Sequence, residues 1–207
     1  MNYFKKSFIV FFLVIFSCFE YSETLILYPN LSGRVQIEYK VPISKQTGKS
    51  LIYFLPVIKS EYEKIYDIKL SNFMVQDTEA LSENFIYKQV NLEYEFRYIM
   101  DLEKRLYGLE NIVRNKNEFH LYRTFPTAAN YNSQDQIFSW VYNFIYEKFA
   151  NRSLKFKILV PTHFSIVSNL GNLPAPGVLN FHFPLERTLD SKNPTTWYVT
   201  ITLNPIP

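Results

Sequence analysis

An unbroken alternation of apolar and polar side chains over residues 90–98 constrains the fold of this chain more than any other feature of its sequence. The apolar members are Val90, Leu92, Tyr94, Phe96 and Tyr98, and the polar members are Asn91, Glu93, Glu95 and Arg97. Successive side chains of a β-strand point to opposite faces of a sheet. The segment therefore predicts a strand with one face on a core and the other in solvent.

Several other segments predict strands by alternation or by runs of β-branched and aromatic residues. They are residues 24–28, 35–41, 119–125, 154–160, 164–167, 178–183 and 197–203. The first two flank a Pro-Asn-Leu-Ser-Gly segment that predicts a hairpin turn, and residues 169–177 predict further turns. The apolar run 51–55 fits either a buried strand or the start of a helix.

Three segments predict helices. Residues 61–67 predict a short one. Asp101 is suited to cap a helix in which Leu102, Leu106, Leu109 and Val113 form a stripe on one side. Ser133, with Gln136 three residues later, predicts a capping box that opens a helix over residues 133–149. We therefore expect a single α+β domain over residues 24–207, with a largely antiparallel curved sheet and two main helices.

The N-terminal residues 1–17 have the order of a bacterial secretion signal: Lys5 and Lys6, then the apolar run 8–16, then Ser17 and Cys18. An uncleaved membrane anchor fits less well, because the stretch between the lysines and Glu20 is shorter than the about 20 residues that span a bilayer. We therefore expect export.

Ile15-Phe16-Ser17-Cys18 resembles a lipobox, the segment that precedes an acylated cysteine, although Phe16 stands where tight lipoboxes have a small residue. Lipidation of Cys18 would leave residues 18–23 as a short acylated tether, with acyl chains such as palmitate in the membrane. Ordinary signal-peptidase cleavage after Ser17 is the alternative, and it would leave a soluble secreted or periplasmic protein. Cys18 is the only cysteine, so the domain folds without an internal disulfide.

Charge and motifs exclude several functions. The chain has 22 basic and 19 acidic residues, and without Lys5 and Lys6 the two are nearly balanced, which argues against nucleic acid as a partner. No serine elbow, phosphate-binding loop or thiol nucleophile occurs in the mature sequence. Glu93 and Glu95 lie on the polar face of the predicted strand 90–98, and a solvated sheet face explains them better than a carboxylate pair for acid–base catalysis. We expect no enzyme activity, no cofactor and no metal.

The histidines and the long helix are the remaining candidates for a site. His120, His163 and His182 lack helical ligand spacing, so surface or strand positions explain them better than a metal site. An aromatic-rich helix over residues 133–149 fits either a packed core or the lining of an apolar cavity. In the second case Trp140 and Phe144 would face a lipid-like ligand.

Short motifs of this chain resemble those of the LppM-like bacterial lipoprotein domains. They are Asn30-Leu31-Ser32-Gly33, the strand that leads to Pro161, Ser168-Asn169-Leu170-Gly171, and the strand over residues 178–185. The chain departs from that scheme at Asn30 and Leu31, where the scheme has Asp and Gly, and at Thr162, where it has Gly. The resemblance implies an α+β domain with a curved sheet in the cell envelope, where lipid or glycolipid contact is one option.

Together these observations predict a lipid-anchored, non-enzymatic cell-envelope protein with an interaction or structural role. Its partners would be the membrane, through its N-terminal acyl chains, and a lipid or another envelope protein. The alternative is a hydrophobic-ligand carrier, soluble or anchored, with its cavity under the 133–149 helix.

Overall fold

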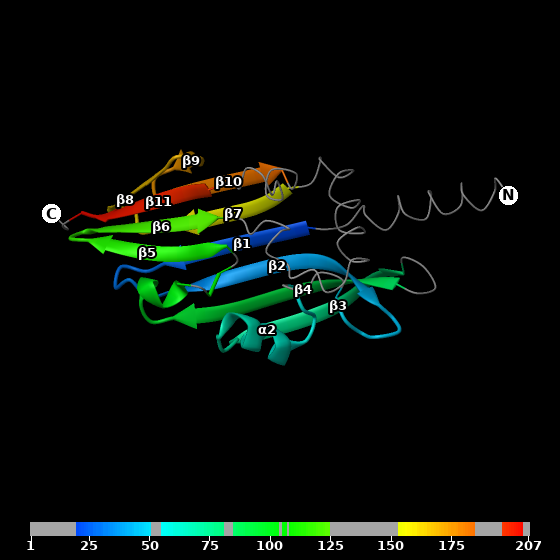
Figure 1. Cartoon of the computed structure of the whole chain (residues 1–207). Coiled ribbons are helices and arrows are strands. Elements are labelled where there is room, and N and C mark those ends of the chain that lie inside the picture. The colour runs from blue at the N-terminus through cyan, green and yellow to red at the C-terminus, as the bar shows by residue number, and fades with distance from the viewer. Residues whose placement is uncertain are drawn as a thin grey trace.

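The computed structural model describes residues 20–50, 55–80, 85–103, 105–106, 108–124, 153–184 and 196–204, which form two β-sheets (Figure 1). The large sheet has seven strands. In spatial order they are β3 (Asn72–Ala80), β4 (Phe85–Phe96), β2 (Gly33–Ser44), β1 (Glu20–Leu27), β7 (Ser153–Leu159), β10 (Val178–Pro184) and β9 (Asn172–Ala175). The small sheet has four strands, in the order β5 (Leu109–Asn115), β6 (Glu118–Thr124), β11 (Thr196–Leu203) and β8 (Phe164–Ser168).

The described strands pair antiparallel, apart from β1 and β7, which lie parallel in the middle of the large sheet. Gly33, the first residue of β2, allows β2 to approach β1 closely. A Cβ atom at Gly33 would lie 2.0 Å from the carbonyl oxygen of Ile26. Residues 90–96 of the strand predicted over 90–98 are confirmed as part of β4, where Val90, Leu92 and Tyr94 are buried, and the strand ends before residues 97 and 98.

The expectation of an α+β fold with two main helices is wrong for the described residues. They contain one short α-helix, α2 (Lys59–Tyr66), and a 3₁₀ turn, η1 (Ile99–Leu102), beside the two sheets. The helix α2 confirms the predicted short helix at 61–67. The fold of the described chain is therefore a two-sheet β structure.

The helix expected after Asp101 is replaced by η1 and β5. Gly108 has a φ of 72°, a left-handed backbone conformation that ends a right-handed helix. Lys116, at a φ of 52°, forms the turn through which β5 pairs with β6. Leu109 and Ile112 are buried in this strand, whereas Val113, a member of the predicted helical stripe, is exposed. Pairing with β6 thus overrides the helical spacing.

One hydrophobic core joins the sheets. On one side the small sheet covers the inner face of β1, β7 and β10, where Trp197 of β11 lies 4.1 Å from Phe181, centroid to centroid. Further along the same face of the large sheet α2 covers β2, where the Tyr62 ring stacks on Tyr39 at 6.4 Å. The large sheet has more strands than the small one, and α2 covers part of the inner face that the small sheet leaves uncovered. None of the helices in the described ranges is long and apolar enough to cross a membrane.

Candidate functional site

A buried ion pair joins the two sheets. Glu23 on β1 and Arg123 on β6 lie 100 residues apart in sequence and are 2% and 5% exposed. Arg123 Nη1 donates to Glu23 Oε1 and Nη2 to Oε2, both at 2.7 Å. Tyr21 donates its hydroxyl proton to the same carboxylate at 2.8 Å. This bidentate geometry makes strong charge-assisted hydrogen bonds and fixes the relative position of the sheets.

Aromatic side chains surround this pair. The Arg123 guanidinium lies 4.5 Å from the Phe156 ring centroid and 5.4 Å from that of Trp197. Burial lowers the pKa of Arg123, but the charge of Glu23 and its hydrogen bonds outweigh burial, and the pKa lies above its ordinary value. Burial, followed by the negative charge of Glu23, raises the pKa of Tyr21 and Tyr94 well above the usual range. The tyrosines therefore stay neutral at physiological pH.

The sequence carries a signal for this buried pair. Glu23 falls in phase with the buried residues of β1, and Arg123 falls in phase with Phe119 and Leu121 on β6. A single charge on an otherwise apolar strand face predicts a buried partner of opposite sign, since an unpaired buried charge is costly. Both strands show this pattern.

A hollow of about 720 Å³ lies on the outer face of the large sheet, on the side away from the small sheet. It extends over β1, β7, β10 and β9. Phe156 and Phe181 belong to its lining, but their rings pack on Trp197 at the inner side. Because side chains alternate along a strand, the residues on either side of them present their side chains outward.

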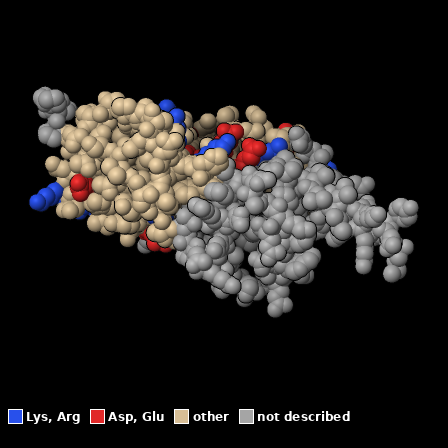
Figure 2. All heavy atoms as spheres, turned by 90° about the horizontal axis from the view of Figure 1, so that it is seen from above, with Lys and Arg blue, Asp and Glu red and all other residues tan. Residues whose placement is uncertain are grey.

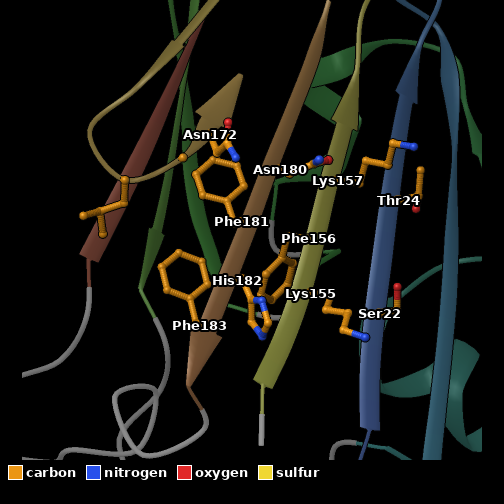
Figure 3. A pocket seen from close by; sticks show the side chains of 12 residues that line it. Ser22, Thr24, Lys155, Phe156, Lys157, Asn172, Asn180, Phe181, His182 and Phe183 are labelled. Carbon is orange, nitrogen blue, oxygen red and sulfur yellow. The ribbon is translucent and has the colours of Figure 1, made fainter. Parts of the chain in front are cut away.

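The outward side chains form two rows, the first across three strands and the second across four (Figure 3). In the first row, Lys155 of β7 lies between Ser22 of β1 and His182 of β10. The second row runs from Thr24 through Lys157 and Asn180 to Asn172 of β9. We call these residues the donor grid: Ser22, Thr24, Lys155, Lys157, Asn180, His182 and Asn172. No aspartate or glutamate occurs among the described residues that line the hollow.

A smaller hollow of about 280 Å³ adjoins the first and shares Ser22 and Thr24 with it. Its acidic groups are already bound within the sheet. Gln89 donates to Glu38 at 2.5 Å, and Gln36 donates to Glu93 at 2.7 Å. The outer face therefore has a cationic half over β7 and β10 and a half over β2 and β4 in which these carboxylates accept hydrogen bonds from neighbouring amides.

The structure separates the histidines that the sequence singled out. His120 lies on β6 in the small sheet, where Nδ1 is 3.0 Å from the Thr200 hydroxyl and Nε2 is 3.4 Å from Glu118. His182 lies on the other sheet, in the donor grid, and His163 precedes β8. In the described part of the chain, no three His, Cys, Asp or Glu side chains come together in a way that could hold a metal ion.

The other predicted site residues lie outside the described ranges. Cys18, Trp140 and Phe144 belong to segments that the structure does not describe. The lipidation site and the apolar cavity under residues 133–149 remain predictions. Of the predicted tether, residues from Glu20 onward already belong to β1.

The edge formed by β8 and β9 is uncharged. Residues 164–185 contain no Lys, Arg, Asp or Glu. Figure 2 looks onto this side of the molecule and shows a broad area without charged side chains. Val167, Leu170 and Leu173 are exposed there. Exposed apolar side chains on outer strands are typical of surfaces that contact a partner.

Comparison with solved structures finds distant likenesses. The folded domain of LppM from Mycobacterium tuberculosis is 10% identical, with 90% of this chain and 91% of that chain covered and a TM-score of 0.49. A variant M1 zinc metallopeptidase from Deinococcus radiodurans is 8% identical, with 90% of this chain and 42% of that chain covered and a TM-score of 0.37. The folded domain of LppM, the family that the sequence motifs resemble, is thus among the structures to which this chain is similar, and scores this low carry no further argument. No curated protein matches the chain.

A family comparison is more extensive. The model of the LIC11874-like family matches residues 13–205, which is most of the chain. The chain belongs to this family.

Proposed function

We propose that this LIC11874-like protein is an exported, lipid-anchored protein of the cell envelope with a non-enzymatic interaction or structural role. Its anchor is the acylated Cys18, and its two-sheet domain is held at a membrane surface.

The observation that carries this proposal is the position of Cys18 between the apolar run 8–16 and strand β1, which begins at Glu20. Cleavage before Cys18 removes the complete secretion signal and leaves every residue of β1 in place. Glu20 pairs with Lys40, and Tyr21 pairs with Leu154. A cut only a few residues further on would remove these pairs from the middle of the large sheet.

The short distance between Cys18 and β1 also determines how the domain would be held. Two residues of extended chain span at most about 7 Å. The acyl chains would therefore hold the first residues of β1 next to the lipid headgroups. The beginning of β7 and the end of β10 lie at the same end of the sheet, because Leu154 pairs with both Tyr21 and Phe183.

The uncharged edge formed by β8 and β9 supports the interaction role. The sheet orders place β9 and β8 at sheet edges, where a strand has a free side. Neither strand carries an edge lysine, the residue with which many proteins block unwanted pairing. The carrier alternative depends on Trp140 and Phe144, which lie outside the described residues.

Intact mass spectrometry tests the anchor. The chain would be expressed in a bacterium and purified from detergent-solubilised membranes, beside a Cys18→Ala variant and a Ser17→Ala control that keeps the cysteine. We expect a mass that begins at Cys18 and carries a diacylglyceryl group, in the native chain and the control. We expect Cys18→Ala to lose this mass and to leave the lipoprotein fraction.

An unmodified chain that begins at Cys18 and remains in the soluble fraction would contradict the proposal. A chain that keeps residues 1–17 in the membrane would contradict it in a different way, because the N-terminal segment would then be the anchor itself.

A further inference from the structure

We infer that the donor grid on the outer face of the large sheet binds a phosphate group, with Lys155 and Lys157 as its cationic centre. This inference depends on the sheet alone and does not require the acyl anchor.

The pairing register brings the grid together. Lys155 and Lys157 lie two residues apart on β7 and point to the same face, about 7 Å from each other along the strand. Neighbouring strands lie about 4.8 Å apart, so Ser22 and His182 flank Lys155 on either side. A lysine side chain is long and flexible enough for both ammonium groups to reach one ligand over the centre of the grid.

The lysines are the only formal charges of the grid, and both are positive. In the described part of the chain neither Lys155 nor Lys157 forms an ion pair, although Lys88 and Arg34 on the same sheet do. Two carboxylates share this face near the grid: Glu20, two residues before Ser22 on β1, and Glu38, opposite Ser22 on β2, which accepts a hydrogen bond from Gln89. Two like charges in phase on one strand repel each other, and a bound anion removes that repulsion.

The hydrogen-bonding groups select the kind of anion. Ammonium groups only donate, and hydroxyl, amide and imidazole groups can each donate a hydrogen bond. A phosphate group offers several acceptor oxygens and up to two negative charges, which matches two lysines surrounded by donors. The hollow, at about 720 Å³, is much larger than a single phosphate group. It therefore has room for the molecule that carries the phosphate.

Two sources supply this chemistry, namely the headgroup of an anionic phospholipid and a soluble phosphorylated metabolite. The row of Ser22, Lys155 and His182 lies nearest the start of β1. The grid is therefore within reach of headgroups when Cys18 is acylated, and it is open to soluble ligands in either case.

The test measures binding to two probes with a chain that carries Cys18→Ala, so that no acyl chain contributes. Inorganic phosphate is titrated at constant ionic strength against chloride, and flotation compares phosphatidylglycerol vesicles with phosphatidylcholine vesicles. The test variant is K155Q/K157Q. The control is K49Q/K64Q, which removes the same charge from two exposed lysines in the β2–α2 loop and on α2. Circular dichroism checks that every variant is folded.

We expect phosphate affinity to fall by about tenfold or more in K155Q/K157Q and by less than about twofold in the control. Flotation with phosphatidylglycerol that is lost in K155Q/K157Q alone identifies the headgroup as the source. Phosphate binding without flotation identifies a soluble ligand. Absence of phosphate binding, or equal losses in the two double variants, overturns the inference. The state of Cys18 has no influence on these outcomes, so the anchor and the grid can fail separately.

Discussion

Replacing Arg123 with methionine would leave the carboxylate of Glu23 buried without its cation. In the native chain that carboxylate is 2% exposed and accepts two guanidinium hydrogen bonds of 2.7 Å, and in the variant the hydrogen bond from Tyr21 would remain. Removing one member of a buried ion pair typically costs about 3–5 kcal/mol, because the other charge stays desolvated. We expect a loss of this size in the free energy of unfolding.

Urea denaturation followed by circular dichroism measures the loss. With a slope of about 2 kcal/mol/M, the unfolding midpoint of Arg123→Met should fall by about 2 M. Replacing both partners, as Glu23→Leu with Arg123→Met, removes both buried charges and keeps a similar volume. We expect the double variant to lie within about 1 kcal/mol of the native chain, because apolar replacements of buried pairs are often neutral or stabilising.

Arg34→Met is the matched control. Arg34 forms an ion pair with Glu93 at 3.9 Å, and its side chain is 40% exposed, so its loss should cost no more than about 1 kcal/mol. The reasoning is refuted if Arg123→Met and Arg34→Met shift the midpoint equally. It is also refuted if the double variant loses as much stability as the single variants Glu23→Leu and Arg123→Met lose together. The two charges would then contribute independently.

Burial raises the pKa of Tyr62 well above its ordinary value, so the folded chain keeps a proton that the unfolded chain loses above about pH 10. The free energy of unfolding should therefore fall as the pH rises further, by up to about 1.4 kcal/mol per pH unit for each such tyrosine. In Tyr62→Phe the urea midpoint of unfolding should depend less on alkaline pH than in the native chain. Gly177 has a φ of 72°, and an added Cβ would lie 2.4 Å from the carbonyl oxygen of Val160. Gly48 has a φ of 69° with no atom within 4 Å of such a Cβ, so Gly177→Ala should destabilise the chain clearly more than Gly48→Ala in the same urea assay. Trp197→Ala removes a ring that is 1% exposed and should cost about 3–5 kcal/mol, seen as a melting temperature about 10 °C lower or more.

Local patterns predicted many strands of this protein because alternation is a property of neighbouring residues. The predicted strands at 35–41, 154–160 and 178–183 correspond to β2, β7 and β10. The same reasoning missed β3 and β9. In β9 a proline and neighbouring turn residues hide a short edge strand that exists through its pairing with β10.

The predicted helix after Asp101 shows how local reasoning fails. The spacing of Leu102, Leu106 and Leu109 fits a helix, and in the structure all three residues are buried. These leucines lie in η1, in the turn that follows it and in β5. Gly108 has a left-handed backbone that a helix does not allow, and β6 supplies hydrogen-bond partners for β5. The sequence thus predicts that these leucines are buried. Whether they lie in a helix or a strand depends on pairing with the neighbouring strand β6.

The faces of several strands, the near balance of charge and the position of Cys18 after an apolar run can be read from the sequence alone, since each is a local or compositional property. Which strands are neighbours depends on the folded arrangement of the whole chain. The parallel pairing of β1 with β7 places Ser22 beside Lys155, and the packing of the two sheets joins Glu23 to Arg123. Both contacts link residues about a hundred or more positions apart. Their formation depends on the burial of the whole core, and no pattern within a short window of sequence encodes it.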